Sequence, residues 1–145
     1  CLTAFIPMLM DTGGNSGSQA CVSIIRGISL NEIEFRDLGR VVWKEIRVSV
    51  LCGVCLAVAC FVKIIVIDML LLKSESVTYL VAFVVCATMA VTVCLAKIVG
   101  STLPLLAKKL GFDPAVMASP IITTIVDFLS LLVYFAFATA MLGIG

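Results

Sequence analysis

The chain is built from long apolar stretches separated by short polar connections. Four of the stretches, residues 2–28, 48–72, 77–106 and 121–142, are long enough to cross a bilayer, which takes about 20 mostly apolar residues. They do not alternate polar with apolar residues, as the strands of a membrane barrel do. Backbone groups in lipid must be satisfied within their own segment, so each stretch is expected to be a helix. The pattern predicts an all-α polytopic membrane protein, a four-span helical bundle forming one domain over residues 1–145.

The composition also favours a membrane protein. The chain is 62% hydrophobic and 13% charged, with a mean hydropathy of +1.24, and a soluble domain of 145 residues has too little interior for that much apolar surface. The net charge is +1. The sequence has no basic patch with interleaved aromatic residues, so a nucleic-acid partner is not expected. There is no His, no nucleophile–base pair and no H-E-x-x-H motif, so an enzyme is not expected.

The cysteines and the first residue add little chemistry. Seven cysteines lie in or beside the apolar stretches, where small buried hydrophobes are the simplest interpretation. Cys52 and Cys55 form a C-x-x-C pair, but no second pair and no His complete a zinc or redox site. The chain starts at Cys1 inside an apolar stretch, without the features of a signal peptide. We therefore expect it to be a piece of a longer protein.

The connections differ in basic residues, which predicts the orientation in the membrane. The first connection, residues 29–47, and the turn before it hold five basic residues, the third holds Lys108 and Lys109, and the second holds only Lys73. The positive-inside rule places the first and third connections in the cytoplasm, and the second connection and the C-terminus outside. Residues 31–47 are interpreted either as an amphipathic helix at the membrane surface or as an ordinary solvated loop helix. Gly111 is a helix-ending residue, and Ser119-Pro120 is a helix start.

The last span contains an aspartate that lipid alone does not tolerate. Asp127 has no basic residue within its own span, and a lone carboxylate at this depth costs roughly 2.5 to 3.5 kcal/mol even on a lenient insertion scale. It must therefore face protein or water. Helical spacing gives Asp127 polar neighbours on one stripe of the span: Thr123, Thr124, Ser130 and Tyr134.

The first span is interrupted by the polar stretch DTGGNSGSQ, residues 11–19. In a helix, Asp11, Gly14, Asn15 and Ser18 share one face, and Thr12, Ser16, Gln19 and Ser23 lie beside them. Gly13 and Gly17 have the G-x-x-x-G spacing, for which close helix packing is the simplest interpretation. The glycines also leave carbonyl oxygens that can face a hydrated ion. Two intramembrane carboxylates together with amides and hydroxyls favour a permeation path over packing alone.

The available ligands indicate a hard cation. Carboxylate, amide, hydroxyl and carbonyl oxygens suit such ions, and Mg²⁺ keeps most of its waters while using one or two carboxylates. One aspartate per chain is too sparse to strip a divalent ion, but two copies of Asp127 facing each other across a dimer axis would hold a hydrated one. Composition alone allows Mn²⁺, Ca²⁺, Na⁺ or H⁺ equally.

Several strings of residues resemble the MgtE family of magnesium channels and transporters. The most specific is Thr12-Gly13-Gly14-Asn15-x-Gly17-x-Gln19 after Pro7. The further matches, in order along nearly the whole chain, are Arg26-Gly27, Leu103-Pro104-Leu105-Leu106, Lys108-Lys109-Leu110-Gly111, Asp113-Pro114-Ala115, Ser119-Pro120, and Asp127 with Tyr134.

The resemblance implies a fold, an ion and a site. The family's membrane domain has five helices and works as a homodimer. This chain would supply the second to fifth helices of each protomer. The expected location is a cell membrane such as the bacterial inner membrane. It implies a Mg²⁺ pore between protomers, lined by the helices of Asn15 and Asp127, with Asp127 as the main carboxylate and the backbone of Thr123 near the ion. Asp11 departs from the pattern, since a small residue, usually Gly, is expected there.

These observations give a set of expected residues and three functional alternatives. The expected metal site is Asp127, Asn15, Thr123, Gly13, Gly14 and Asp11, and the expected pore lining is Thr12, Ser16, Gly17, Gln19, Thr124 and Ser130. The first alternative is a Mg²⁺ channel, with Mn²⁺ or Ca²⁺ at the same site left open. The others are a cation-coupled secondary transporter and a non-conducting membrane assembly module whose polar stripes hold helices together.

Overall fold

The protein is a bundle of long helices. The structure, a computed structural model, describes residues 2–71, 78–117 and 120–142. Its elements are η1 (Leu2–Phe5), α1 (Ile6–Ser29), η2 (Phe35–Asp37), α2 (Leu38–Lys63), η3 (Ile64–Leu71), α3 (Tyr79–Lys109), η4 (Pro114–Met117) and α4 (Pro120–Leu142). The described residues contain no strand, so the predicted all-α fold is confirmed.

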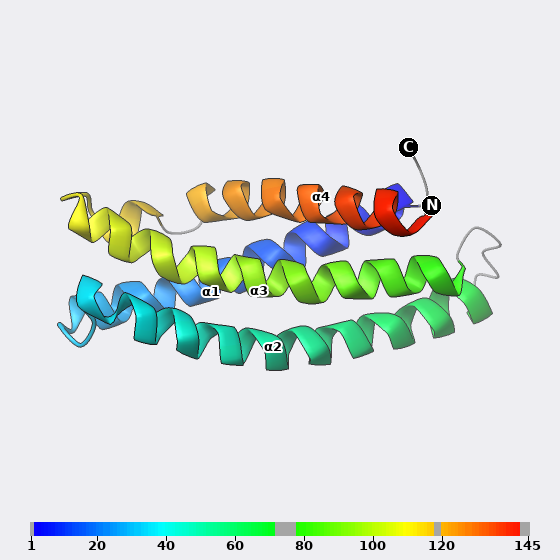
Figure 1. Cartoon of the computed structure of the whole chain (residues 1–145), viewed down its shortest axis with the longest axis horizontal. Helices are drawn as coiled ribbons and strands as arrows, with labels where there is room; N and C mark the ends of the chain where they lie inside the picture. The colour runs from blue at the N-terminus through cyan, green and yellow to red at the C-terminus, as the bar shows by residue number, and fades with distance from the viewer. Residues whose placement is uncertain (1, 72–77, 118–119, 143–145) are drawn as a thin grey trace.

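Helix α3 lies at the centre of the bundle. It packs against α1, α2 and α4, and α1 also packs against α4. Figure 1 shows α2 and α4 on opposite sides of α3, with α1 crossing the bundle obliquely. The α1–α2 and α3–α4 connections lie at the same end of the bundle. The first and third connections therefore share one side, as their basic residues predict.

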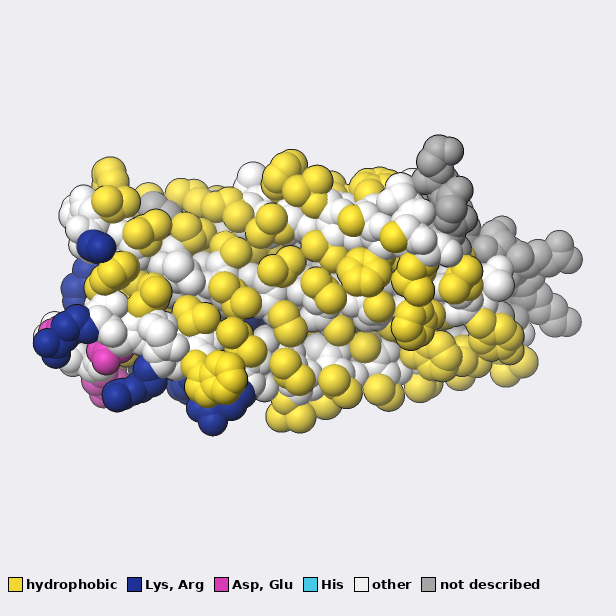
Figure 2. All heavy atoms as spheres, in the orientation of Figure 1, with side chains coloured by type: hydrophobic (Ala, Val, Ile, Leu, Met, Phe, Trp, Pro, Cys, Tyr) yellow, Lys and Arg dark blue, Asp and Glu magenta, His cyan; other side chains and the backbone are white. Residues whose placement is uncertain are grey.

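The surface is apolar along most of its length. Large hydrophobic side chains such as Leu51, Phe83 and Phe128 are exposed, and in Figure 2 hydrophobic atoms cover most of the visible face, while charged side chains gather toward one end. Among the described residues three helical stretches are long and apolar enough to cross a membrane: Phe35–Asp68, Tyr79–Lys109 and Pro120–Met141. Helix α1 is not among them, because its polar residues 11–19 lower its hydropathy.

The second helix begins earlier than the sequence indicates. Residues 31–47 do not form a separate surface helix: a short turn, Phe35–Asp37, leads directly into α2 at Leu38, ten residues before the predicted start at residue 48. The reason is that the buried face continues without a break through Val41, Glu45 and Ser49 at a spacing of four residues. The Glu34–Asp37 capping box closes the start of this turn.

The other helix ends follow local signals. Gly111 has a φ of 81°, the left-handed conformation that ends a helix at glycine, and α3 stops at Lys109. Helix α4 is described from Pro120, while the predicted cap, Ser119, lies outside the described residues. Residues 72 and 77, predicted ends of the second and third spans, also lie outside them.

Candidate functional site

A small polar cavity lies between α1 and α4. It has a volume of about 160 Å³ and is lined by Met10, Asp11, Gly14, Asn15, Thr123 and Asp127. Five of the six residues expected at the metal site therefore share one cavity. Helical spacing explains the grouping, since Gly14 and Asn15 follow Asp11 by three and four residues, and residue 127 follows residue 123 by four.

Gly14 allows α4 to come close to α1 at this point. A methyl group placed on Gly14 would lie 3.3 Å from Thr123 Cγ2 and 3.6 Å from Asp127 Oδ1. The missing side chain therefore leaves the aspartate facing the backbone of α1. The Thr123 hydroxyl donates to the Pro120 carbonyl at 3.0 Å.

Gly13 and Gly17 lie on a different face of α1. Both are buried; a Cβ on Gly13 would lie 2.8 Å from Thr92 Cγ2, and one on Gly17 would lie 3.0 Å from Ile122 Cγ2. On the facing helix, a Cβ on Gly100 would overlap the carbonyl of Gly17. This geometry supports the close-packing interpretation of G-x-x-x-G, and their role at an ion stays a prediction.

Two expected pore-lining residues of α4 are also placed away from the cavity. Ser130 is buried near Gly13 and donates to the Val126 carbonyl at 2.6 Å. Thr124 is exposed and donates to the Pro120 carbonyl at 2.8 Å. Neither lines the cavity around Asp127, so their contact with an ion path stays a prediction.

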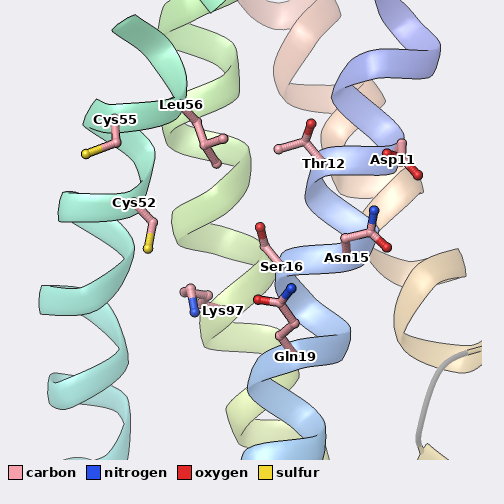
Figure 3. Close-up of a pocket in the computed structure, with 9 residues that line it drawn as sticks. All are labelled: Asp11, Thr12, Asn15, Ser16, Gln19, Cys52, Cys55, Leu56 and Lys97. Carbon is pink, nitrogen blue, oxygen red and sulfur yellow. The ribbon is translucent and has the colours of Figure 1, made fainter. Parts of the chain in front are cut away.

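A second, larger cavity lies on the other side of the polar face of α1. It has a volume of about 430 Å³, and Figure 3 shows its walls on three helices. Its lining is Asp11, Thr12, Asn15, Ser16 and Gln19 from α1, Cys52, Cys55 and Leu56 from α2, and Lys97 from α3. The expected pore-lining residues Thr12, Ser16 and Gln19 are thus brought together here. Asp11 and Asn15 line both cavities.

The carboxylates at this site are few. Within the described ranges no group of three or more His, Cys, Asp or Glu residues is placed to hold a metal ion. The cavity between α1 and α4 offers two carboxylates, Asp11 and Asp127. That number suits an ion that keeps most of its water shell better than one stripped of water.

The chain matches a known family over most of its length. The family model MgtE, described as a divalent cation transporter, matches residues 6–137. The chain belongs to the MgtE family. Its relatives include the magnesium transporter MgtE of Bacillus subtilis, 33% identical over 141 residues and 97% of this chain, and that of Thermus thermophilus, with the same identity and coverage. The magnesium transporter MgtE of Enterococcus faecalis is 31% identical over 95% of this chain.

The MgtE match confirms the resemblance read from the G-G-N-x-G-x-Q string. It covers only part of the length of the relatives. The chain spans 30% of the length of the B. subtilis protein and 29% of the other two. The matched segment contains the helices that form both cavities. The membrane-embedded helices are therefore those of an MgtE protein.

Sequence reasoning missed one charged pair that this MgtE chain buries. Lys97 Nζ on α3 lies 3.6 Å from Glu45 Oε2 on α2, and the two side chains are 11% and 10% exposed. Lys97 was visible as a charge inside an apolar stretch, but Glu45 belonged to the segment interpreted as either a membrane-surface helix or a solvated loop helix. The missing information was that α2 begins early enough to bring residue 45 against α3.

Proposed function

We propose that this chain forms the ion-conducting membrane part of a Mg²⁺ channel. The observation that carries the proposal is the cavity in which α1 and α4 bring Asp11, Asn15, Thr123 and Asp127 together. Membership of a divalent cation transporter family supports the class of cargo. The printed function of the three relatives, magnesium transport, supports the ion.

In this proposal Asp127 attracts a hydrated Mg²⁺ and the neighbouring oxygens contact its water shell. Mg²⁺ gives up water reluctantly and is usually held by one or two carboxylates with its remaining waters in place. Asn15 and Thr123 line the same cavity as the aspartate, and both carry a side-chain oxygen. Backbone carbonyls around Gly13 and Gly14 complete the contacts. Mn²⁺ and Ca²⁺ prefer the same kind of ligand and compete for this site.

The polar face of α1 supports a homodimer with the pore between protomers. Asp11, Asn15 and Gln19 are exposed in the single chain, although the helices around them are apolar enough for lipid. Exposed carboxylates and amides at membrane depth must face water or another polar surface. A second copy that faces this surface would enclose a water-filled path and place two copies of Asp127 beside it.

The basic residues of the connections indicate which end of the proposed path faces the cytoplasm. The last turn of α1, the connection after it and the start of α2 hold five basic residues, and α3 ends with Lys108 and Lys109. The positive-inside rule places this end in the cytoplasm and the C-terminus outside. Inward flow then follows the membrane potential, which for a divalent ion contributes about 4.6 kcal/mol per 100 mV, twice the monovalent figure.

The test is ion uptake by vesicles that contain the reconstituted chain. Wild type is expected to take up Mg²⁺, and Asp127→Asn is expected to lose most of that uptake, because the amide keeps the shape and removes the charge. Asp68→Asn is the matched control. It removes a carboxylate of η3, outside both cavities, and is expected to keep uptake within about twofold of wild type.

The same assay separates the alternatives. Uptake that stops when a proton or sodium gradient is collapsed would indicate a coupled transporter rather than a channel. Absence of uptake by correctly folded wild-type protein would favour a non-conducting assembly module. Full uptake by Asp127→Asn would remove Asp127 from the mechanism.

A further inference from the structure

A buried ion pair lies behind the larger polar cavity. Lys97 Nζ and Glu45 Oε2 are 3.6 Å apart, and both side chains are about nine-tenths buried. The hydroxyls next to them along each helix are engaged with their own backbone: Ser49 donates to Ile46 at 2.7 Å, and Ser101 donates to Ile98 at 3.0 Å. Glu45 is thus the charged partner that the structure gives to Lys97.

Lys97 belongs to the wall of the polar cavity, while Glu45 does not line it. Figure 3 shows Lys97 on α3, across from Ser16 and Gln19 of α1. The same cavity contains Asp11 and Asn15, which also line the cavity around Asp127. A positive charge therefore stands beside the polar helix that carries the proposed cation path, with one carboxylate behind it.

We propose that Glu45 is a positioning residue for cation passage: by neutralising Lys97 in the cavity wall, it keeps that wall from repelling a divalent cation. The inference rests on the proposed Mg²⁺ path and adds a residue that lies outside it. In the low-dielectric interior of a bundle an uncompensated charge acts over a longer range than in water, and it repels a divalent ion twice as strongly as a monovalent one. The pair therefore sets the charge that an approaching Mg²⁺ meets.

The other charges near the cavity do not replace Glu45. Asp11 lines the cavity but is exposed on α1, where it contributes to the attraction of the cation. Lys63 and Asp68 form a separate pair at 2.7 Å at the junction of α2 and η3, and neither residue lines the two cavities. This second pair provides a control of the same chemistry at a different place.

The test compares Mg²⁺ uptake by reconstituted variants of the chain over a range of Mg²⁺ concentrations. Glu45→Gln leaves Lys97 uncompensated and is expected to raise the half-saturating Mg²⁺ concentration by about tenfold or more. Glu45→Gln with Lys97→Gln removes both charges and is expected to return it to within about threefold of wild type. Glu45→Asp keeps the carboxylate and is expected to stay close to wild type.

The control removes the carboxylate of the other pair. Asp68→Asn leaves Lys63 uncompensated, 41% exposed and outside both cavities, and is expected to change the half-saturating concentration by less than about twofold. A tenfold increase in this control would mean that any lost ion pair impairs uptake, and would overturn the inference.

A further variant tests the inference if Glu45→Gln does not fold. The exchange Glu45→Lys with Lys97→Glu keeps the pair and moves the carboxylate to the cavity side, so the half-saturating concentration is expected to fall. An unchanged or raised value would contradict the inference. So would a loss in the double Gln variant as large as in Glu45→Gln, which would indicate a purely structural pair.

The outcomes for the two proposals are distinct. Wild-type uptake that is lost in Asp127→Asn and unchanged in Glu45→Gln would reject the role of Glu45 and leave the proposed function intact. No uptake by folded wild-type protein would reject the proposed function itself.

Discussion

Helix α1 has two faces that differ in what they contact, although both come from the same nine-residue stretch, residues 11–19. One face, at Gly13 and Gly17, is closed: it lies against α3 and α4 so tightly that a Cβ would meet their atoms at 2.8–3.0 Å. The other face, at Asp11 and Asn15, is open and lines two cavities. Glycine therefore serves two separate purposes here, close backbone packing on one face and access to Asp127 on the other.

In this helix the small residues on one face allow polar residues on the other. The closed face holds α1 against its neighbours through close backbone contact at its glycines, together with buried apolar side chains such as Leu9 and Cys21. That leaves the opposite face available for carboxylate and amide groups. Substitutions that act on one face should therefore change stability, and those on the other should change ion uptake.

The largest expected effect is at Gly100 of α3, which lies against the closed face of α1. Gly100→Ala places a methyl group on the carbonyl of Gly17, which is backbone and cannot move aside, so α1 and α3 must separate. We expect a loss of about 3 kcal/mol, measured as a lower unfolding temperature in detergent. Gly39→Ala is the control, since a Cβ there meets nothing within 4 Å. Equal stability of the two variants would contradict the close contact.

The neighbouring residues Gly13 and Gly14 give the sharpest separation of the two faces. Gly13→Ala brings a methyl group 2.8 Å from Thr92 Cγ2 and is expected to lower stability by about 2 kcal/mol. Gly14→Ala makes only contacts of 3.3 Å or more, one of them 3.6 Å from Asp127 Oδ1. It is expected to stay folded and to raise the half-saturating Mg²⁺ concentration about tenfold, because Mg²⁺ sites tolerate little distortion.

The measurement for this pair is thermal unfolding and Mg²⁺ uptake on the same preparations. Reversal of the pattern, with Gly13→Ala affecting uptake alone and Gly14→Ala affecting stability alone, would mean that the ion path lies on the glycine-packed side of α1.

The smallest expected effect is at Asp11, on the open face. Asp11→Gly restores the small residue expected in the family and removes an exposed charge that lines both cavities. Exposed charges interact weakly through water, so the half-saturating Mg²⁺ concentration is expected to rise roughly threefold. A change as large as that of Asp127→Asn, measured in the same uptake assay, would make Asp11 a direct ion ligand.

The sequence predicted most of the fold because its signals are long and local. Twenty or more apolar residues in lipid leave helix as the only state, and Gly111 ended its helix by the usual left-handed conformation. The start of α2 was wrong by ten residues, since charged side chains such as Glu45 suggested a surface segment. Helical periodicity alone does not reveal which helix will cover a charge.

The grouping of residues at the candidate site could be predicted only as far as spacing allows. Spacing placed Asp11, Gly14 and Asn15 on one face and Asp127 with Thr123 on another, and the structure brings the two sets together. The expected metal site nevertheless included both Gly13 and Gly14, and only Gly14 lines the cavity, because that depends on the direction from which α4 approaches α1. The Lys97–Glu45 pair depends in the same way on the contact between α2 and α3.

The low hydropathy of α1 has a consequence for biogenesis. Among the described helical segments α2, α3 and α4 meet the length and apolarity needed to cross a membrane, and α1 does not. A segment that lipid does not retain on its own is retained by the helices that shield its polar groups. Insertion of α1 and its docking against α3 and α4 are therefore expected to be one coupled event during synthesis, and the proposed ion path is assembled only once the later helices have emerged.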